Sequence, residues 1–129
     1  MYCLDTSIII AIFRGDKELA KKISGLDPNS IFFTPVTLCE LFKGAYKSQQ
    51  KEKSLALIYD FSVNYRLLGS SARGCELFGK DFNILEKAGK PTQEFDLMMA
   101  SIAKENGLVL VTRNRKHFEN VQDLKLEVW

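Results

Sequence analysis

Short runs of apolar residues alternate with longer amphipathic stretches along this sequence. Continuously apolar runs occur at Met1–Leu4, Ile31–Phe33 and Leu108–Val111, and such runs are typical of strands that are buried on both faces of a parallel sheet. Two weaker patterns, at Arg66–Leu68 and Leu124–Val128, predict a further short strand and an alternating edge strand. The pattern therefore predicts a sheet of four or five strands.

Helical periodicity fills the segments between these runs. The clearest helix begins at Thr34-Pro35, and its apolar stripe recurs at helical spacing up to Ala45. Helices that separate buried strands are typical of an α/β fold with a mainly parallel central sheet flanked by helices. No linker interrupts the pattern, so residues 1–129 are expected to form one domain. The other predicted helices cover Ile8–Phe13, Lys17–Ser24, Ser54–Ser62, Ser71–Lys87 and Phe95–Glu105.

Composition and charge exclude some classes of protein. Apolar residues make up 46% and charged residues 26% of the 129, values that exclude a disordered tail or a fibre. The net charge of +2 neither requires nor excludes a nucleic-acid partner. No uncharged apolar stretch approaches the ~18–20 residues of a membrane helix, and no signal-peptide pattern is present. A cytoplasmic protein without membrane contact is therefore expected.

The cysteines and the single histidine do not support a zinc site or a hydrolase triad. Cys3, Cys39 and Cys75 each lie within an apolar pattern, which predicts small buried core residues. His117 follows two basic residues and is expected on a solvated turn. Because zinc needs several closely spaced soft ligands, the chemistry is expected from other side chains.

Four polar side chains are predicted at one edge of the sheet. Ligands of an open parallel sheet bind beyond the carboxyl ends of its strands. Asp5 follows the first strand, Glu40 lies one turn into the helix after the second strand, and Asn114 follows the strand Leu108–Val111. Asp96 opens the helix that leads into that last strand, and such a helix starts near the same edge. The four side chains are therefore expected at a common rim.

Three carboxylates and an amide at one rim favour a bound cation, because like charges otherwise repel one another. Such oxygen ligands suit Mg²⁺ or Mn²⁺, and these ions activate water and neutralise charge on a phosphodiester that is being hydrolysed. Arg113, Arg115 and Lys116 flank Asn114 in the sequence and are suited to contacts with substrate phosphates. The rim indicates a metal-dependent reaction at phosphorus.

Each rim residue also has an ordinary structural interpretation. Asp5 can cap a helix, Asp96 can complement a helix N-terminus, and Asn114 can be a turn residue. Glu40 can lie on a solvated face or complete a capping box with Thr37. The functional hypothesis therefore depends on the coincidence of the acids at one rim.

A repeated tetrapeptide leaves one assignment open at this point. Cys-Glu-Leu-Phe occurs at Cys39–Phe42 and again at Cys75–Phe78, on two predicted helices. The flanking sequences do not repeat, which indicates coincidence rather than a structural repeat. The residues alone do not decide whether Glu40 or Glu76 carries the chemistry.

Four short motifs in this order resemble those of the PIN domain family, and more closely those of its VapC toxins from prokaryotic VapBC toxin–antitoxin systems. Each motif is weak alone, and the resemblance covers the whole chain, including the ending Leu126-Glu127-Val128-Trp129. The motifs are Leu4-Asp5-Thr6-Ser7, Thr37-Leu38-Cys39-Glu40-Leu41 with Gly44-Ala45, Phe95-Asp96-Leu97-Met98-Met99-Ala100, and Leu110-Val111-Thr112-Arg113-Asn114 with Phe118.

The resemblance implies a toxin endoribonuclease that depends on Mg²⁺, with Mn²⁺ as the alternative ion. It also implies an RNA substrate (tRNA or rRNA), a homodimer, and inhibition by a cognate VapB-type antitoxin. The metal-binding acids of the family correspond to Asp5, Glu40 and Asp96, and its fourth catalytic position corresponds to Asn114. Glu76 matches no family motif, so the resemblance favours Glu40.

The resemblance also implies a mechanism. A water held by the ion attacks phosphorus and leaves 5′-phosphate and 3′-hydroxyl ends. Thr6, Ser7 and Thr112 are expected to orient carboxylates and waters around the ion. Family members often have Asn where Ser7 stands, and the Ser7 hydroxyl is expected to serve as the donor instead. The neutral Asn114 removes one charge, so the number of ions stays open.

Two other functions fit parts of the pattern. A phospho-receiver signalling domain has a similar size and acids at its strand ends, but it pairs two acids after the first strand, where Asp5 stands alone. A PIN-like scaffold that binds RNA or protein without cutting is the second alternative, and the presence of all three acids argues against it.

The expected partners follow from the same rim. An antitoxin that silences the site is expected to cover it, with an arginine or lysine in place of the metal. The apolar helices around Leu38–Ala45 and Leu55–Phe61 are the expected region of a dimer face.

Overall fold

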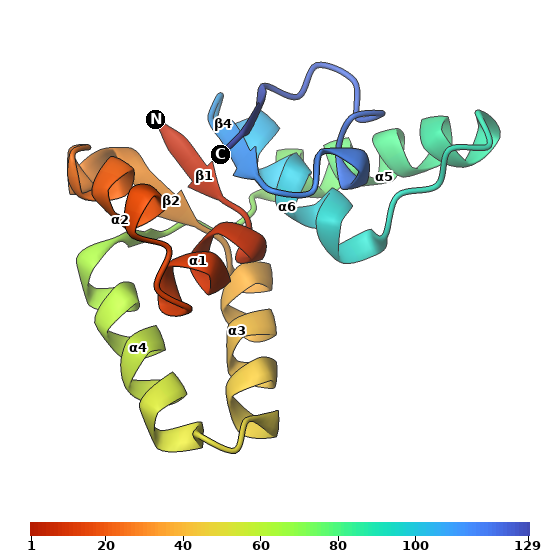
Figure 1. Ribbon diagram of the computed structural model, residues 1–129. Helices are drawn as coiled ribbons and strands as arrows, with labels where there is room; N and C mark the ends of the chain where they lie inside the picture. Colours follow the sequence, from red (N-terminus) through yellow and green to blue (C-terminus); the bar gives the residue numbers. More distant parts are fainter.

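All five strands lie parallel in one sheet, in the order β3-β2-β1-β4-β5 (Figure 1). The computed structural model describes residues 1–129. The predicted α/β fold with a mainly parallel sheet is therefore confirmed, and the sheet contains no antiparallel strand. The strands are β1 (Tyr2–Leu4), β2 (Ile31–Phe33), β3 (Arg66–Leu67), β4 (Val109–Thr112) and β5 (Leu126–Val128).

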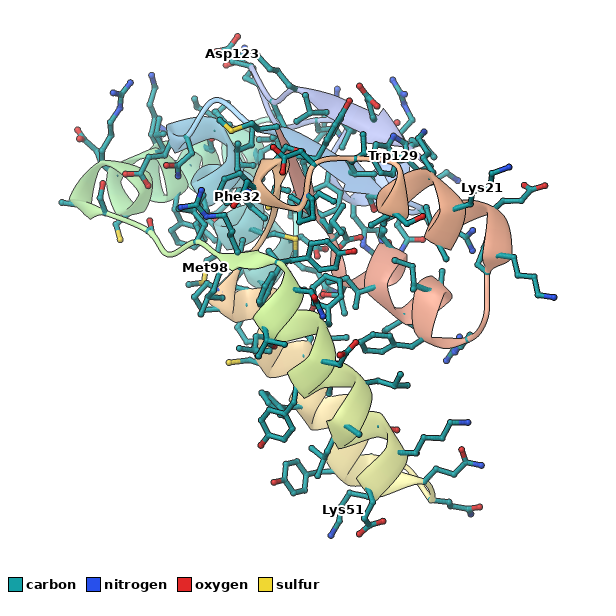
Figure 2. All side chains as sticks on the ribbon, turned by 90° about the vertical axis from the view of Figure 1, so that its left-hand side faces the viewer. Lys21, Phe32, Lys51, Met98, Asp123 and Trp129 are labelled. Atoms are coloured by element: carbon teal, nitrogen blue, oxygen red, sulfur yellow. The ribbon has the colours of Figure 1, made fainter.

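Six α-helices connect the strands, and α3 and α4 form a long antiparallel hairpin that projects away from the sheet (Figure 1). Lys51 lies at the tip of this hairpin (Figure 2). The α4 helix begins three residues earlier than its apolar pattern indicates, because the pattern does not mark its polar first turn. The helices are α1 (Thr6–Phe13), α2 (Lys17–Ser24), α3 (Pro35–Lys47), α4 (Lys51–Asn64), α5 (Ala72–Lys87) and α6 (Glu94–Glu105), with 3₁₀ turns η1 (Pro28–Ser30) and η2 (Arg115–His117).

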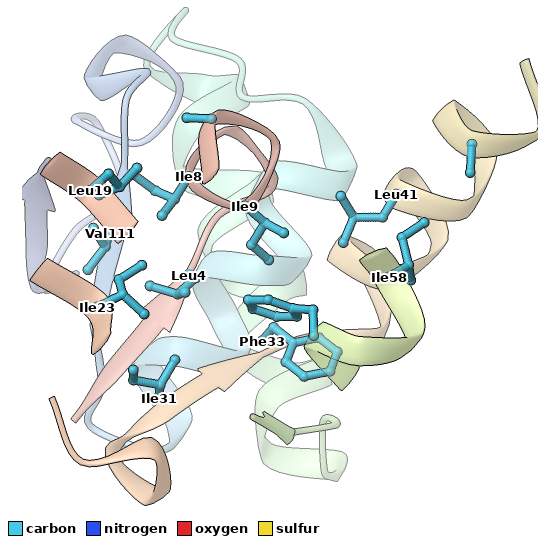
Figure 3. Packing of buried hydrophobic residues seen from close by; sticks show 13 residues of the cluster. Leu4, Ile8, Ile9, Leu19, Ile23, Ile31, Phe33, Leu41, Ile58 and Val111 are labelled. Carbon is cyan, nitrogen blue, oxygen red and sulfur yellow. The ribbon is translucent and has the colours of Figure 1, made fainter. Parts of the chain in front are cut away.

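Side chains of alternating strand residues pack into two hydrophobic cores, one on each face of the sheet. Leu4 and Val111 pack with α1, α2, α3 and α4 in a cluster that Figure 3 shows around Phe33. Their neighbours Cys3 and Leu110 pack on the opposite face with α5 and α6. Because helices cover both faces, the central strands β1 and β2 are apolar throughout, as the sequence pattern predicts, whereas the edge strands β3 and β5 carry Arg66 and Glu127. No helix has the length and apolar character needed to cross a bilayer.

The prediction that all three cysteines are buried is wrong for two of them. Cys3 is fully buried in β1, whereas Cys39 and Cys75 are exposed. Cys39 precedes the buried Leu41 by two residues, and a helix turns by about 200° over that distance, so the thiol faces outward. An apolar residue near an amphipathic stripe is therefore not always part of it.

The apolar helices that were expected to supply a dimer face mostly serve the core of the chain itself. Leu41 and Ala45 of α3 are buried against Ile58 and Phe61 of α4 and the sheet. The homodimer stays a prediction.

Candidate active site

The sheet register brings the first acid beside the end of β4. Leu4 pairs with Val111, and the backbone N–H of Asp5 donates to the carbonyl oxygen of Val111 at 2.9 Å. Asp5 therefore lies next to Thr112, at the carboxyl edge of the parallel sheet. The predicted rim is at this edge.

A pocket of about 390 Å³ opens at this edge and contains all four predicted rim residues. They come from four segments: the β1–α1 junction, the second turn of α3, the first turn of α6 and the loop after β4. The fold thus brings together residues that are up to 109 positions apart, from Asp5 to Asn114. The lining residues are Asp5, Thr6, Ser7, Ile10, Glu40, Lys43, Gly44, Lys47, Asp96, Asn114 and His117.

Two hydroxyl groups hold one oxygen of the Asp5 carboxylate. Ser7 Oγ and Thr112 Oγ1 each donate to Asp5 Oδ2 at 2.6 Å. Asp5 occupies the N-cap position of α1, yet its side chain makes no capping hydrogen bond. No buried side-chain nitrogen or oxygen lacks a partner, so Oδ1, which accepts no hydrogen bond, is reached by solvent. The capping interpretation of Asp5 is therefore wrong, and Oδ1 is free for a ligand.

The backbone of the loop after β4 donates hydrogen bonds to the same two hydroxyl groups. The backbone N–H of Arg113 donates to Ser7 Oγ at 3.1 Å, and that of Asn114 donates to Thr112 Oγ1 at 2.9 Å. Each hydroxyl thus accepts from the backbone while it donates to Asp5. This network fixes the position of Asn114 relative to the carboxylate.

Glu40 is held by α1 and takes no part in capping α3. Thr6 Oγ1 donates a hydrogen bond to Glu40 Oε2. Thr34, not Thr37, is the N-cap of α3, and its hydroxyl accepts from the backbone N–H of Thr37 at 3.2 Å. The predicted capping box is therefore absent, and the carboxylate of Glu40 is directed to the pocket. Glu76, in the second copy of the tetrapeptide, is exposed on α5 and does not line the pocket.

The pKa of the Asp96 carboxyl group is affected by its burial and by the other two acids. Its side chain is only 14% exposed, and this burial is the main reason why its pKa is raised above the ordinary value. The negative charges of Asp5 and Glu40 raise the pKa further, and His117 opposes the shift. The three carboxylates therefore form one electrostatic unit with an excess of negative charge.

His117 lines the pocket, although the sequence provides no reason to place it there. It lies on the exposed turn η2, as expected, but its Nδ1 is 3.2 Å from Asp96 Oδ2. The ring therefore holds one oxygen of Asp96 and forms one side of the pocket. This contact depends on the path of the loop after β4, and no local pattern in the sequence indicates it.

The donor set fits a hard divalent cation. Each of the three carboxylates has one oxygen engaged by a protein donor, which leaves the other available. No three His, Cys, Asp or Glu side chains converge closely enough to hold a metal ion together by direct contacts. Mg²⁺ commonly keeps several waters and binds proteins through few direct carboxylate contacts, so an open acidic pocket suits it.

The three basic residues predicted to bind substrate do not line the acidic pocket. Arg113 forms an ion pair with Asp16 and lines an adjoining hollow of about 610 Å³. Arg115 Nε lies 4.0 Å from Glu119 Oε2, and Lys116 is exposed on η2. The cations that do line the acidic pocket are Lys43 and Lys47. Their spacing of three and seven residues after Glu40 is a helical signal that could have indicated them.

Comparison with known proteins identifies the family. The family model of the PIN domain matches residues 2–124 of this chain. The chain belongs to the PIN domain family. It is 35% identical over 131 aligned residues to Ribonuclease VapC1 of Haemophilus influenzae, which covers all of this chain and 98% of that protein. It is 34% identical to the tRNA(fMet)-specific endonuclease VapC of Shigella flexneri, over 99% of this chain and 97% of the relative.

Solved structures of this family share the fold over nearly the whole chain. VapBC2 from Rickettsia felis, bound to a DNA fragment from its promoter, matches with a TM-score of 0.92 and 28% identity, over 99% of this chain and 98% of that one. VapBC-1 from Haemophilus influenzae matches with a TM-score of 0.88 and 34% identity, over 99% and 97% of the two chains. Membership of this PIN family removes the phospho-receiver alternative.

Proposed function

We propose that this PIN-family chain is the toxin endoribonuclease of a type II toxin–antitoxin system and that it hydrolyses RNA with the help of Mg²⁺ or Mn²⁺. The convergence of Asp5, Glu40 and Asp96 from three separate segments on one pocket carries the proposal. The pKa of Asp96, raised first by burial and then by the charges of Asp5 and Glu40, supports it, because a bound cation would stabilise the ionised form of this carboxyl against both effects. The names of the VapC relatives support ribonuclease activity.

In this proposal the three acids would hold the ion, directly or through water. The bound ion would supply charge neutralisation at the phosphodiester and an activated water. Asp5 presents its free Oδ1 because Ser7 and Thr112 hold Oδ2. Thr6 orients Glu40 in the same way. Asn114 would orient water or substrate at the pocket wall, where its neutral amide adds no further repulsion.

The proposal includes the partners. The two solved structures compared above are VapBC complexes, so a VapB-type antitoxin is the proposed inhibitor of this chain. A groove of about 310 Å³ between α1, α3 and α4 shares Ile10, Glu40 and Gly44 with the acidic pocket, and a partner segment in it would reach the acids. A homodimer and a cytoplasmic location, where tRNA and rRNA are found, complete the proposal.

Cleavage of tRNA tests this function directly. The purified chain, freed of any antitoxin, is incubated with total tRNA in Mg²⁺, in Mn²⁺ and in EDTA, and the product ends are examined. We expect cleavage with either ion, none in EDTA, and 5′-phosphate and 3′-hydroxyl ends. RNA binding without cleavage under every metal condition would instead identify a non-catalytic scaffold.

The duplicated tetrapeptide supplies a matched control. Glu40→Gln is expected to abolish cleavage, whereas Glu76→Gln, in the same local sequence but outside the pocket, is expected to cleave like the parent. Asp5→Asn and Asp96→Asn are expected to be inactive. Unchanged activity in both aspartate variants would exclude the proposed site.

A further inference from the structure

We propose that the face of α3 formed by Lys43, Gly44 and Lys47 binds the phosphate backbone of the RNA next to the acidic pocket. This inference rests on the proposed function and assigns the substrate contacts differently from the sequence analysis. The three residues lie on one helix, line the acidic pocket, and follow Glu40 by three, four and seven positions.

Lys43 and Lys47 are the lysines of the pocket, and neither of them forms an ion pair. Both side chains are exposed, and neither has a carboxylate oxygen within 4.0 Å. Four residues of helix separate them by about 6 Å along the axis, comparable to the step between neighbouring phosphates of one strand. Paired cations at this spacing can contact two successive phosphates while the scissile bond lies over the acids.

Two of the three basic residues after β4 are less available for this task, and the third, Lys116, does not line the acidic pocket. Arg113 is engaged by Asp16, and Arg115 lies close to Glu119. A phosphate would have to compete with these carboxylates. The two lysines of α3 meet no such competition, so they are the better phosphate ligands beside the acids.

Gly44, which lies between the two lysines on α3, independently supports close approach of the RNA backbone to this helix. Glycine in a helix interior destabilises the helix relative to alanine. A Cβ placed on Gly44 would meet no atom within 4 Å, so packing does not require glycine here. Absence of a side chain between the two lysines allows an RNA backbone to approach the helix closely.

The hollows around Gly44 define a path. Gly44 lines both the acidic pocket and the groove between α1, α3 and α4, and the two hollows join there. A strand that occupies the acidic pocket and continues toward the groove passes directly over this glycine. The lysines lie on either side of that path in the sequence of α3.

The salt dependence of RNA binding tests the lysines. A labelled short single-stranded RNA is titrated with the parent chain in EDTA, which prevents cleavage, at several salt concentrations. Each phosphate contact contributes about 0.7 to the slope of log affinity against log salt for single strands. The Lys43→Gln/Lys47→Gln double variant should therefore lose about 1.4 from the slope. A matched i, i+4 pair on α2, Lys17→Gln/Lys21→Gln, lies outside the pocket and should keep the parent slope.

The two glycine variants test the close approach. Gly44→Ala should raise the melting temperature and yet weaken RNA binding several-fold. Gly79→Ala, at an equally open glycine on α5, should raise the melting temperature without changing RNA binding. Parent-like RNA affinity in Gly44→Ala would overturn the proposed path.

The outcomes separate this inference from the proposed function. If the parent cleaves tRNA and the lysine double variant keeps both slope and affinity, the inference is wrong and the lysines are left for the antitoxin. If the parent neither binds nor cleaves RNA with Mg²⁺ or Mn²⁺, the proposed function itself is wrong. Loss of slope in the α2 control as well would show only a general effect of charge, and would also overturn the inference.

Discussion

Thr112 donates a hydrogen bond to Asp5 Oδ2 at 2.6 Å, although the two residues are 107 positions apart in the sequence. The contact exists because β1 and β4 are neighbouring parallel strands whose carboxyl ends meet at the same edge. Ser7 donates to the same oxygen, so Asp5 keeps Oδ1 for a ligand. The orientation of this acid is therefore set by the register of the sheet.

Removal of the Thr112 hydroxyl is expected to reduce cleavage. Thr112→Val keeps the shape of the buried side chain but removes the donor to Asp5 and the acceptor for the N–H of Asn114. Loss of such an orienting partner typically costs about 10–100-fold in activity or metal affinity. Initial rates of tRNA cleavage at saturating Mg²⁺, with circular dichroism as a check of folding, measure the effect.

The conservative variant Thr112→Ser provides the control, because it retains the hydroxyl. It should cleave within a few-fold of the parent rate. A slow serine variant together with a parent-like valine variant would mean that the methyl group, and not the hydrogen bond, matters.

Thiol reactivity is expected to separate Cys3 from the other cysteines. Burial, with a smaller effect of the Asp5 charge, raises the pKa of the Cys3 thiol to about 12, so its thiolate is scarce at neutral pH. Cys39 and Cys75 are exposed and free. A colorimetric thiol reagent at pH 8 should therefore titrate two thiols in the folded chain and a third only after denaturation. Rapid reaction of all three thiols in the folded chain would contradict the buried position of β1.

The placement of the rim could be predicted because it follows from topology. Alternation of buried strands and helices implies parallel strands, and parallel strands bring Asp5 and Asn114 to one edge together with the start of α6. Their placement thus needed no knowledge of side-chain contacts. Their catalytic roles stay predictions.

Residues whose placement depends on loop conformation could not be predicted in the same way. His117 of η2 contacts Asp96 in the first turn of α6, whereas Arg115 and Lys116 of the same turn do not line the pocket. Proximity in sequence to Asn114 was therefore a poor guide to which residues line the acidic pocket. Lys43 and Lys47, by contrast, share a helix face with Glu40 and were open to prediction from periodicity.

The pair of α5 and α6 is expected to depend on a buried ion pair. Lys104 Nζ lies 2.6 Å from Asp81 Oδ2, and the two side chains are 9% and 5% exposed. Asp81→Asn leaves the lysine charge buried without a partner, which typically costs about 3–5 kcal/mol of unfolding free energy. Urea denaturation at pH 7 measures this difference.

Two further variants test the cause of that loss. The double variant Asp81→Leu/Lys104→Met removes both charges and should recover most of the stability. Glu119→Gln, at the exposed contact with Arg115, should change the free energy of unfolding by less than about 1 kcal/mol. If the double variant is no more stable than Asp81→Asn, the loss does not arise from an unpaired charge.

Asp96→Asn is expected to stabilise the metal-free fold at neutral pH while it abolishes cleavage. The folded-state pKa of Asp96 is raised, so the stabilising contribution of its protonated form is present at low pH and is lost as the pH rises through the folded pKa. Asparagine does not ionise and avoids this loss. The stability of the variant relative to the parent should therefore be small in acid and increase toward neutral pH in EDTA.

Addition of Mg²⁺ should reverse this order, because an ion that binds only the folded parent stabilises it by mass action. Urea denaturation of both proteins from acid to neutral pH, with and without Mg²⁺, measures all four conditions. A variant that is less stable than the parent in EDTA at neutral pH would show that the Asp96–His117 contact outweighs burial and repulsion. Without a cation, repulsion among the three acids would weaken the fold, and the same repulsion would favour the binding of one.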